Sequence, residues 1–147
     1  MKKIVALAAV SIVFIMVLTS CSKTDDTVPA SGMGAVTGVH TFFVAPPLFT
    51  AVRTSGNLYL AASDTANKRS IYITVNNFTG NTGTVNVDNN FVTAIYDSSA
   101  THTTKGYTGT VTFTSVSPQL VGTFNFNCLD STKIKTGTFS IAAPVVQ

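Results

Sequence analysis

Few side chains of this sequence could act as an acid, a base or a nucleophile. The chain contains no glutamate, two histidines and two cysteines. Asp97-Ser98 followed by His102 supplies the residue types of a hydrolase triad. A hydrolase serine usually stands on a strained turn flanked by glycines, and no glycine flanks Ser98. We therefore do not expect a hydrolase site here.

The remaining acids and bases are scattered. His40 and His102 are far apart in sequence and show no metal-ligand spacing. Glycoside hydrolysis needs two carboxylates that face each other across a cleft, and no pattern pairs two of them here. Four aspartates are expected in or next to turns: Asp64, Asp88, Asp97 and Asp130. We expect no catalytic residue, no cofactor and no metal, and hence a protein that is not an enzyme.

Cys21 has the clearest chemical context. Lys2-Lys3 precede an apolar run from Ile4 to Leu18, and Leu18-Thr19-Ser20 lead directly into Cys21. The run is shorter than the roughly 20 residues of a membrane span and is typical of a signal sequence. These residues resemble the lipobox of bacterial lipoproteins. The resemblance implies a signal peptide over residues 1–20, cleavage before Cys21, and lipidation of Cys21.

In that class of proteins the cysteine carries diacylglyceryl on sulfur and usually a further acyl chain, such as palmitate, on nitrogen. Two or more chains anchor a protein stably. We expect attachment to the outer membrane of the cell envelope, on its periplasmic or surface-exposed side, with residues 21–32 as a flexible tether. Lys23-Thr24-Asp25-Asp26 resembles the export signal of surface lipoproteins in the Bacteroidota, and a solvated linker is the alternative.

Removal of the signal peptide leaves a nearly neutral chain, in which five lysines and two arginines face six aspartates. The sequence therefore has no basic patch for nucleic acid. Lipidation of Cys21 would leave Cys128 without a cysteine partner inside the chain. Cys128 follows Phe124-Asn125-Phe126-Asn127, a strand-like run, and is expected to be buried.

Residues 33–147 are predicted to form a single all-β domain. Apolar residues alternate with polar ones, as at Leu58, Leu60 and Ala62, which is the period of a strand. Strands are expected near 35–38, 40–45, 48–53, 57–62, 70–76, 82–87, 91–96, 109–116, 120–128 and 134–142. Short turns between them favour mostly meander connections. We predict an antiparallel sandwich or flattened barrel of about nine to ten short strands.

A pattern of glycine, threonine and alternating apolar residues recurs four times. It begins at Gly83, Gly109, Gly122 and Gly137, and each glycine is expected to begin a strand or permit a bulge. The lipobox, the short linker and the closing Gly-Thr-Phe strands resemble a family of uncharacterised envelope lipoproteins of the Bacteroidota. The resemblance implies an all-β domain and an envelope address, and it implies no activity.

Tyrosines and short acidic motifs are the remaining candidate sites. An outward tyrosine can stack on a sugar or anchor a protein contact, although tyrosine also simply suits a half-buried sheet. The candidates are Tyr59, Tyr72, Tyr96 and Tyr107. Three Asp-Thr or Asp-Ser motifs resemble the O-glycosylation acceptor of the Bacteroidota, which makes Thr27, Thr65 and Ser131 candidate glycosylation sites.

Two functions agree with these features. The first is a monomeric, lipid-anchored binding module for a glycan or an envelope protein, attached to the membrane through the lipid on Cys21. The alternative is a structural or stabilising envelope lipoprotein with no small-molecule ligand. A concave or aromatic-lined face would favour the first, and polar faces throughout would favour the second.

We predict that Cys21 carries lipid, because the apolar run, the small residues and the cysteine are in register. Cells fed a clickable fatty acid should label the wild-type chain and not Cys21→Ala. Cys128→Ala is the matched control and should be labelled like the wild type. Equal labelling of the wild type and Cys21→Ala would contradict the prediction.

Overall fold

The structure is a computed structural model that describes residues 31–38 and 40–144. Residues 1–30, with the proposed signal peptide, Cys21 and Thr27, lie outside this part of the chain. Ten strands and no helix occur within it. They are β1 (Gly32–Thr37), β2 (His40–Val44), β3 (Phe49–Thr54), β4 (Asn57–Asp64), β5 (Arg69–Val75), β6 (Gly83–Asn86), β7 (Val92–Ser99), β8 (His102–Ser115), β9 (Gln119–Cys128) and β10 (Lys133–Ala142). The predicted all-β class is confirmed.

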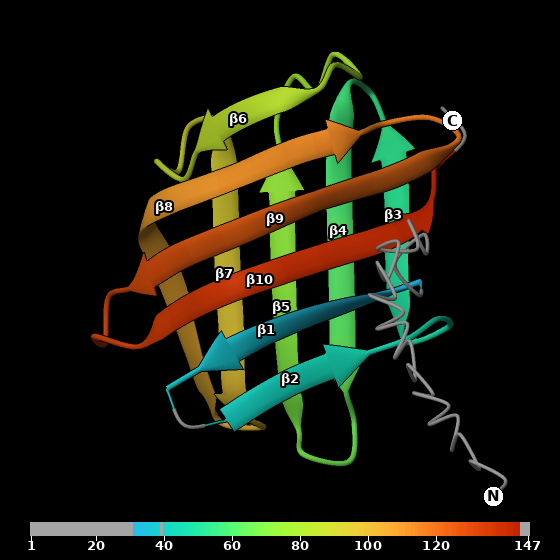
Figure 1. Cartoon of the computed structure of the whole chain (residues 1–147). Helices are drawn as coiled ribbons and strands as arrows, with labels where there is room; N and C mark the ends of the chain where they lie inside the picture. The colour runs from blue at the N-terminus through green and yellow to red at the C-terminus, as the bar shows by residue number, and fades with distance from the viewer. Residues whose placement is uncertain (1–30, 39, 145–147) are drawn as a thin grey trace, which may run out of the picture.

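The strands form one antiparallel sheet that folds back on itself into two layers (Figure 1). The front layer holds β6, most of β8, β9, β10, β1 and β2, and the back layer holds β7, β5, β4 and β3. The sheet ends at β2 and β3, which a short turn joins without pairing them. The molecule is therefore a nearly closed, flattened barrel with one open seam, which is one of the two architectures, sandwich or flattened barrel, predicted from the sequence.

β8 joins the two layers. Its residues His102–Lys105 pair with β7 in the back layer, and its residues from Gly106 onward pair with β9 in the front layer. The early part of β8 was not predicted, since the sequence indicated strands only near 91–96 and 109–116. His102–Lys105 contains no apolar residue, so it has no period to detect. Pairing with β7, rather than burial, makes this segment a strand.

The same pairing corrects the expected position of Asp97. The carboxylate was placed in a turn, but Asp97 lies within β7, opposite Ser70 of β5 and Thr103 of β8. The other predicted turns near aspartates are present. Asp88 Oδ1 accepts hydrogen bonds from the backbone nitrogens of Asn90 and Phe91, at 3.0 and 2.8 Å. Asp88-Asn89-Asn90 is therefore a capped turn.

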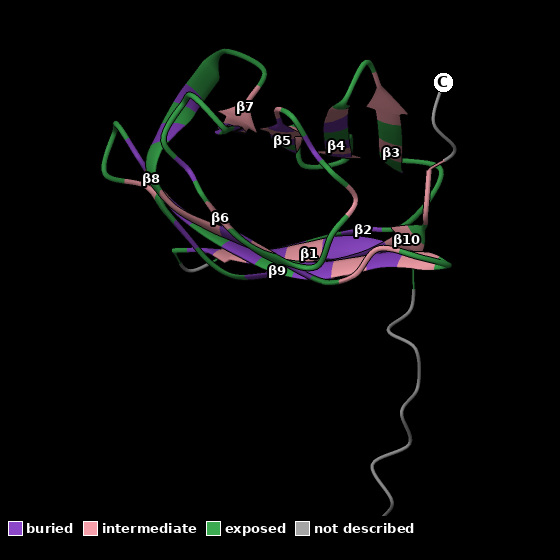
Figure 2. Ribbon diagram, turned by 90° about the horizontal axis from the view of Figure 1, so that it is seen from above, coloured by how far each residue is buried: buried purple, intermediate pink, exposed green. Residues whose placement is uncertain are grey.

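The core lies between the layers, on their facing surfaces (Figure 2). The back layer contributes mainly aliphatic side chains, whereas the front layer contributes aromatic ones. The fully buried large residues include Leu58, Leu60, Ile71 and Ile73 from the back layer and Phe42, Phe124, Phe126 and Phe139 from the front layer. This alternation of buried and exposed positions follows the period of two predicted from the sequence.

Glycines in the front layer make room for these rings. Phe113, Gly122 and Phe139 occupy one register row across β8, β9 and β10. Strands two apart are separated by about 9.6 Å, yet the centroids of the Phe113 and Phe139 rings are 5.6 Å apart. The rings lean over Gly122, where a Cβ atom would collide with the Phe139 ring. A residue with a side chain at position 122 would separate them.

This packing corrects the expected role of the repeated glycines. Gly83 begins β6, but Gly109, Gly122 and Gly137 lie inside β8, β9 and β10. Gly109 and Gly137 lie beside register shifts, so the expected link to bulges holds there. Gly122 and Gly137 are each opposite a phenylalanine on a neighbouring strand, and this close approach explains why glycine stands in mid-strand.

We predict that Gly137→Ala lowers the free energy of unfolding by about 1–3 kcal/mol, as is usual for overpacking. The added methyl would meet atoms of the Phe124 ring at 2.5–2.6 Å. Urea unfolding measures the loss. Combining Gly137→Ala with Phe124→Leu should give less than the sum of the two separate losses, since the smaller side chain vacates that space.

Gly34→Ala is the matched control, because a methyl there would approach its neighbours no closer than 3.4 Å. Gly34 also lies in a strand and faces a phenylalanine, Phe43. Its substitution should be close to neutral. Equal losses for Gly34→Ala and Gly137→Ala would show that general strand preference, and not the ring contact, determines the effect.

Candidate functional site

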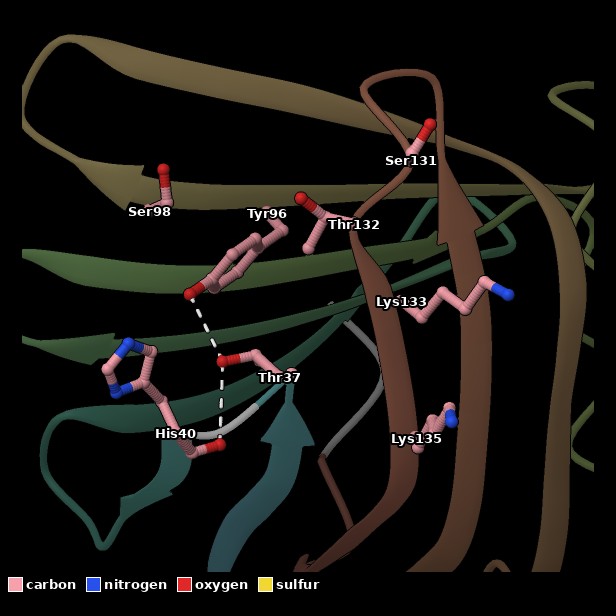
Figure 3. A pocket seen from close by; sticks show the side chains of 9 residues that line it. Thr37, His40, Tyr96, Ser98, Ser131, Thr132, Lys133 and Lys135 are labelled. Atoms are coloured by element: carbon pink, nitrogen blue, oxygen red, sulfur yellow. Dashed lines mark hydrogen bonds between the residues drawn. The ribbon is translucent and has the colours of Figure 1, made fainter.

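A cavity opens at one end of the barrel, between the two layers (Figure 3). Its volume is about 560 Å³. The turn between β1 and β2, the strand β7, and the turn between β9 and β10 surround it. We call it the end cavity and define it by Thr37, His40, Tyr96, Ser98, Ser131 and Thr132. Five of these six side chains carry a hydroxyl group, so the cavity offers hydrogen-bonding groups on a lining that is otherwise mostly apolar.

Tyr96 links the two layers within the end cavity. Its hydroxyl donates to Thr37 Oγ1 at 3.4 Å, and Thr37 Oγ1 donates to the carbonyl oxygen of His40 at 3.5 Å. Both distances exceed the usual 2.5–3.0 Å or so of an O–H···O bond. These weak bonds leave the two hydroxyls able to exchange their partners for a ligand.

The expectation that Tyr96 faces outward is wrong. Tyr96 is only 3% exposed, because it shares the inward phase of Val92 and Ala94 on β7, while Ile95 takes the outward phase. The period of two was visible in the sequence. Which of the two phases faces the core depended on the packing of β7 against the front layer.

Two lysines also line the end cavity. Lys133 and Lys135 are exposed, and Figure 3 shows their amino groups directed away from Tyr96 and His40. No aspartate is among the described residues that line the cavity. The cavity therefore offers hydroxyls and one imidazole, without a carboxylate to act as its partner in acid–base chemistry.

The other three candidate tyrosines are exposed, as predicted. Tyr59 and Tyr72 lie on the outer face of the back layer, where Tyr59 is opposite Thr74 and Tyr72 is opposite Ala61. This register makes the two rings diagonal neighbours, about 7–8 Å apart at their Cα atoms. Tyr107 is exposed on β8. None of these three lines the end cavity.

The residues that resembled a triad are separated in the structure. Ser98 lines the end cavity, whereas Asp97, the preceding residue of the strand, lines a shallow hollow with Ser70 and Thr103. His102 Nε2 is instead 2.8 Å from Asp130 Oδ2. That hydrogen bond, and a further one from the backbone nitrogen of Thr132, lower the pKa of Asp130. Both partners are partly exposed, so the pair contributes little stability.

Sequence reasoning did not find the pair of His102 and Asp130. The two residues are joined only because β8 and β9 are neighbours, with His102 at the start of β8 and Asp130 just past the end of β9. Their sequence separation gave no signal. Knowledge that β8 extends back to His102 would have been needed to place them together.

Cys128 is buried, as predicted. Burial, and then the negative charge of Asp130, raise the pKa of the Cys128 thiol from 9.0 to about 11, and a hydrogen bond with Thr104 acts in the opposite direction. A thiol with a raised pKa is a poor nucleophile at neutral pH. Proximity to the pair of His102 and Asp130 therefore does not make Cys128 reactive.

The candidate glycosylation sites that the structure describes are both in exposed turns. Thr65 lies between β4 and β5, and Ser131 lies between β9 and β10 at the edge of the end cavity. No group of three His, Cys or Asp side chains that could hold a metal occurs in residues 31–38 and 40–144. Across the same residues, no helix is long and apolar enough to cross a membrane.

The chain matches no protein-family description, no curated protein and no solved structure.

We predict that Cys128→Ser costs about 1–3 kcal/mol at neutral pH, if the buried hydroxyl is left poorly bonded. The difference should narrow as the pH rises from 9 to 11. In that range the unfolded thiol ionises and the folded thiol does not, so the wild type loses stability that the serine variant cannot lose. Urea unfolding at several pH values measures the effect.

Two results would contradict this prediction. One is a difference between wild type and Cys128→Ser that stays constant from pH 7 to pH 11. The other is rapid reaction of the native protein with a thiol reagent, at the rate seen in urea. Either would show that the thiol is accessible or already ionised in the folded state.

Proposed function

We propose that this protein is a lipid-anchored envelope protein whose β domain binds a polar ligand in the end cavity without catalysing a reaction. The observation that carries the proposal is the cavity itself, of about 560 Å³, with a buried tyrosine hydroxyl inside it. Ligand sites usually have volumes of about 300–1,000 Å³ and often lie in the mouths of barrels.

The lining favours an uncharged ligand with hydroxyl or amide groups. Tyr96, Thr37, Ser98 and Thr132 supply hydroxyls that both donate and accept, and His40 supplies an imidazole at the rim. A ligand that replaced the long bond between Tyr96 and Thr37 with shorter ones would gain stability. A charged ligand would gain less, since the lysine amino groups point away (Figure 3).

The anchoring half of the proposal comes from the sequence. Leu18-Thr19-Ser20-Cys21 resembles a lipobox, and Ser31 is only ten residues beyond Cys21. Ten residues span at most roughly 35 Å when extended. A lipid on Cys21 would hold the domain near the outer membrane, where it could meet a glycan or an envelope protein.

A glycan on Ser131 would compete with this use of the end cavity, because Ser131 lies at its edge. Thr65 lies outside the cavity lining, so modification there is compatible with binding. Mass spectrometry of the protein isolated from its native envelope shows whether Ser131 or Thr65 carries a glycan.

We predict that Tyr96→Phe weakens binding about tenfold, which corresponds to about 1.4 kcal/mol for one lost hydrogen bond. Tyr72→Phe removes the same atom from the outer face and is the matched control. Arrays of glycans and envelope proteins identify the bound class, and titration with that compound gives the affinities. Equal affinity of Tyr96→Phe and wild type would contradict the cavity as the site.

The same protein tests the alternatives. If no glycan and no envelope protein on the arrays binds, a structural or stabilising role is favoured. Turnover of a hydrolase substrate that is lost in His40→Ala, His102→Ala or Asp97→Ala would show that the protein is an enzyme.

A further inference from the structure

The outer face of the front layer carries a row of threonines. Thr84, Thr112, Thr123 and Thr138 are register partners across four neighbouring strands, β6, β8, β9 and β10. Neighbouring strands are about 4.8 Å apart, so the hydroxyls form a nearly regular line. The Oγ1 atoms of Thr84 and Thr112 are 2.8 Å apart and share a hydrogen bond.

Amides and a further threonine form the next row. Asn86 is opposite Thr110, which is opposite Asn125, and Asn125 Nδ2 donates to Thr110 Oγ1 at 2.9 Å. Both rows consist of uncharged groups that donate and accept hydrogen bonds. We call these two rows the threonine face.

The first row continues to an exposed aromatic ring. Thr138 is opposite Gly34 of β1, and Gly34 is opposite Phe43 of β2. The Phe43 ring lies over the glycines of β1, since a Cβ atom on Gly32 would be 2.9 Å from Cζ of that ring. One side of the ring is thereby supported by backbone, while the residue remains 61% exposed.

A hollow of about 360 Å³ lies between the ring and the threonine face. It is lined by Phe43, Thr114, Thr123, Thr138 and Ser140, among other residues, and none of its described lining residues is charged. Ser140 is only 2% exposed, and its hydroxyl has no hydrogen-bond partner among the described residues. An unpaired buried hydroxyl costs stability, and Ser140 places one directly beside the hollow.

We propose that this hollow and the adjoining threonine face form a second site, which binds a neutral oligosaccharide. A sugar ring has C–H groups that pack on an aromatic face and hydroxyls around its edge. Phe43 supplies the aromatic face, and Thr114, Thr123 and Thr138 supply hydroxyls beside it. The aromatic ring of the hollow therefore matches the C–H face of a sugar, and its hydroxyls match the hydroxyls at the edge of the sugar.

The absence of charged residues from the described lining of the hollow favours a neutral sugar. An acidic sugar would leave its carboxylate without a cation, and desolvating an unpaired charge is costly. A peptide would be expected to add to the free edge of β2 through its backbone. That mode would not need the hydroxyls of β9 and β10, which lie inward from the edge.

The second site is distinct from the end cavity. The end cavity opens between the layers, whereas the threonine face is on the outside of the front layer. No residue lines both. Substitutions can therefore test the two sites independently, and either proposal can fail without the other.

Calorimetric titration of the full lipidated protein in detergent tests the inference. The probes are cellohexaose, laminarihexaose, mannohexaose and xylohexaose, with hexagalacturonic acid as the charged comparison. We expect at least one neutral hexasaccharide to bind, with at least a fivefold loss in Phe43→Ala and in Phe43→Leu, since stacking needs the ring. Thr138→Val, which removes a hydroxyl at constant shape, should weaken binding about two- to fivefold.

Phe91→Ala is the matched control, because Phe91 is 54% exposed and lies between β6 and β7, away from the hollow. It should bind like the wild type. The inference is overturned if no neutral hexasaccharide binds, if hexagalacturonic acid binds more tightly, or if Phe43→Ala has no effect. Binding that is lost in Tyr96→Phe but kept in Phe43→Ala would assign the sugar to the end cavity instead.

Discussion

The front layer depends on one constraint, which is that the rings of Phe113 and Phe139 meet over a residue with no side chain. Gly122 satisfies it, and the contact fixes the register of β8, β9 and β10 relative to one another. A slip of one residue in any of these strands would turn its rings to the outside and its threonines into the core. The order of the outer face is therefore a consequence of the packing of the inner face.

The second organising feature is the passage of β8 from one layer to the other. Because β8 pairs first with β7 and then with β9, the two layers face each other and Tyr96 of β7 meets Thr37 of β1. That contact lies at the end of the barrel where the end cavity opens between the layers. Position in the fold, and not any local motif, makes these two residues neighbours.

Much of the fold was predictable because alternation is a local property. Leu58, Leu60 and Ala62, or Val111 and Phe113, reveal their strands without knowledge of their partners. The rest needed pairing. His102–Lys105 forms a strand only beside β7, the inward phase of Tyr96 depends on the opposite layer, and the pair of His102 and Asp130 depends on the β8–β9 hairpin. The row of four threonines also appears only when the registers are known, although the four glycine–threonine repeats contain all of its members.

The small number of charged residues affects how the end cavity and the threonine face could bind a partner. Only 10% of the residues are charged, so long-range attraction can contribute little to finding or holding a partner. Recognition by hydroxyls, amides and a supported ring acts only at contact distance and gives modest affinity for each group. A tether of ten residues to a lipid would offset this weakness by keeping the domain at high local concentration near its partners on the envelope. In the proposed function the anchor and the uncharged surfaces would serve one purpose, because weak contacts become effective where the molecule cannot diffuse away.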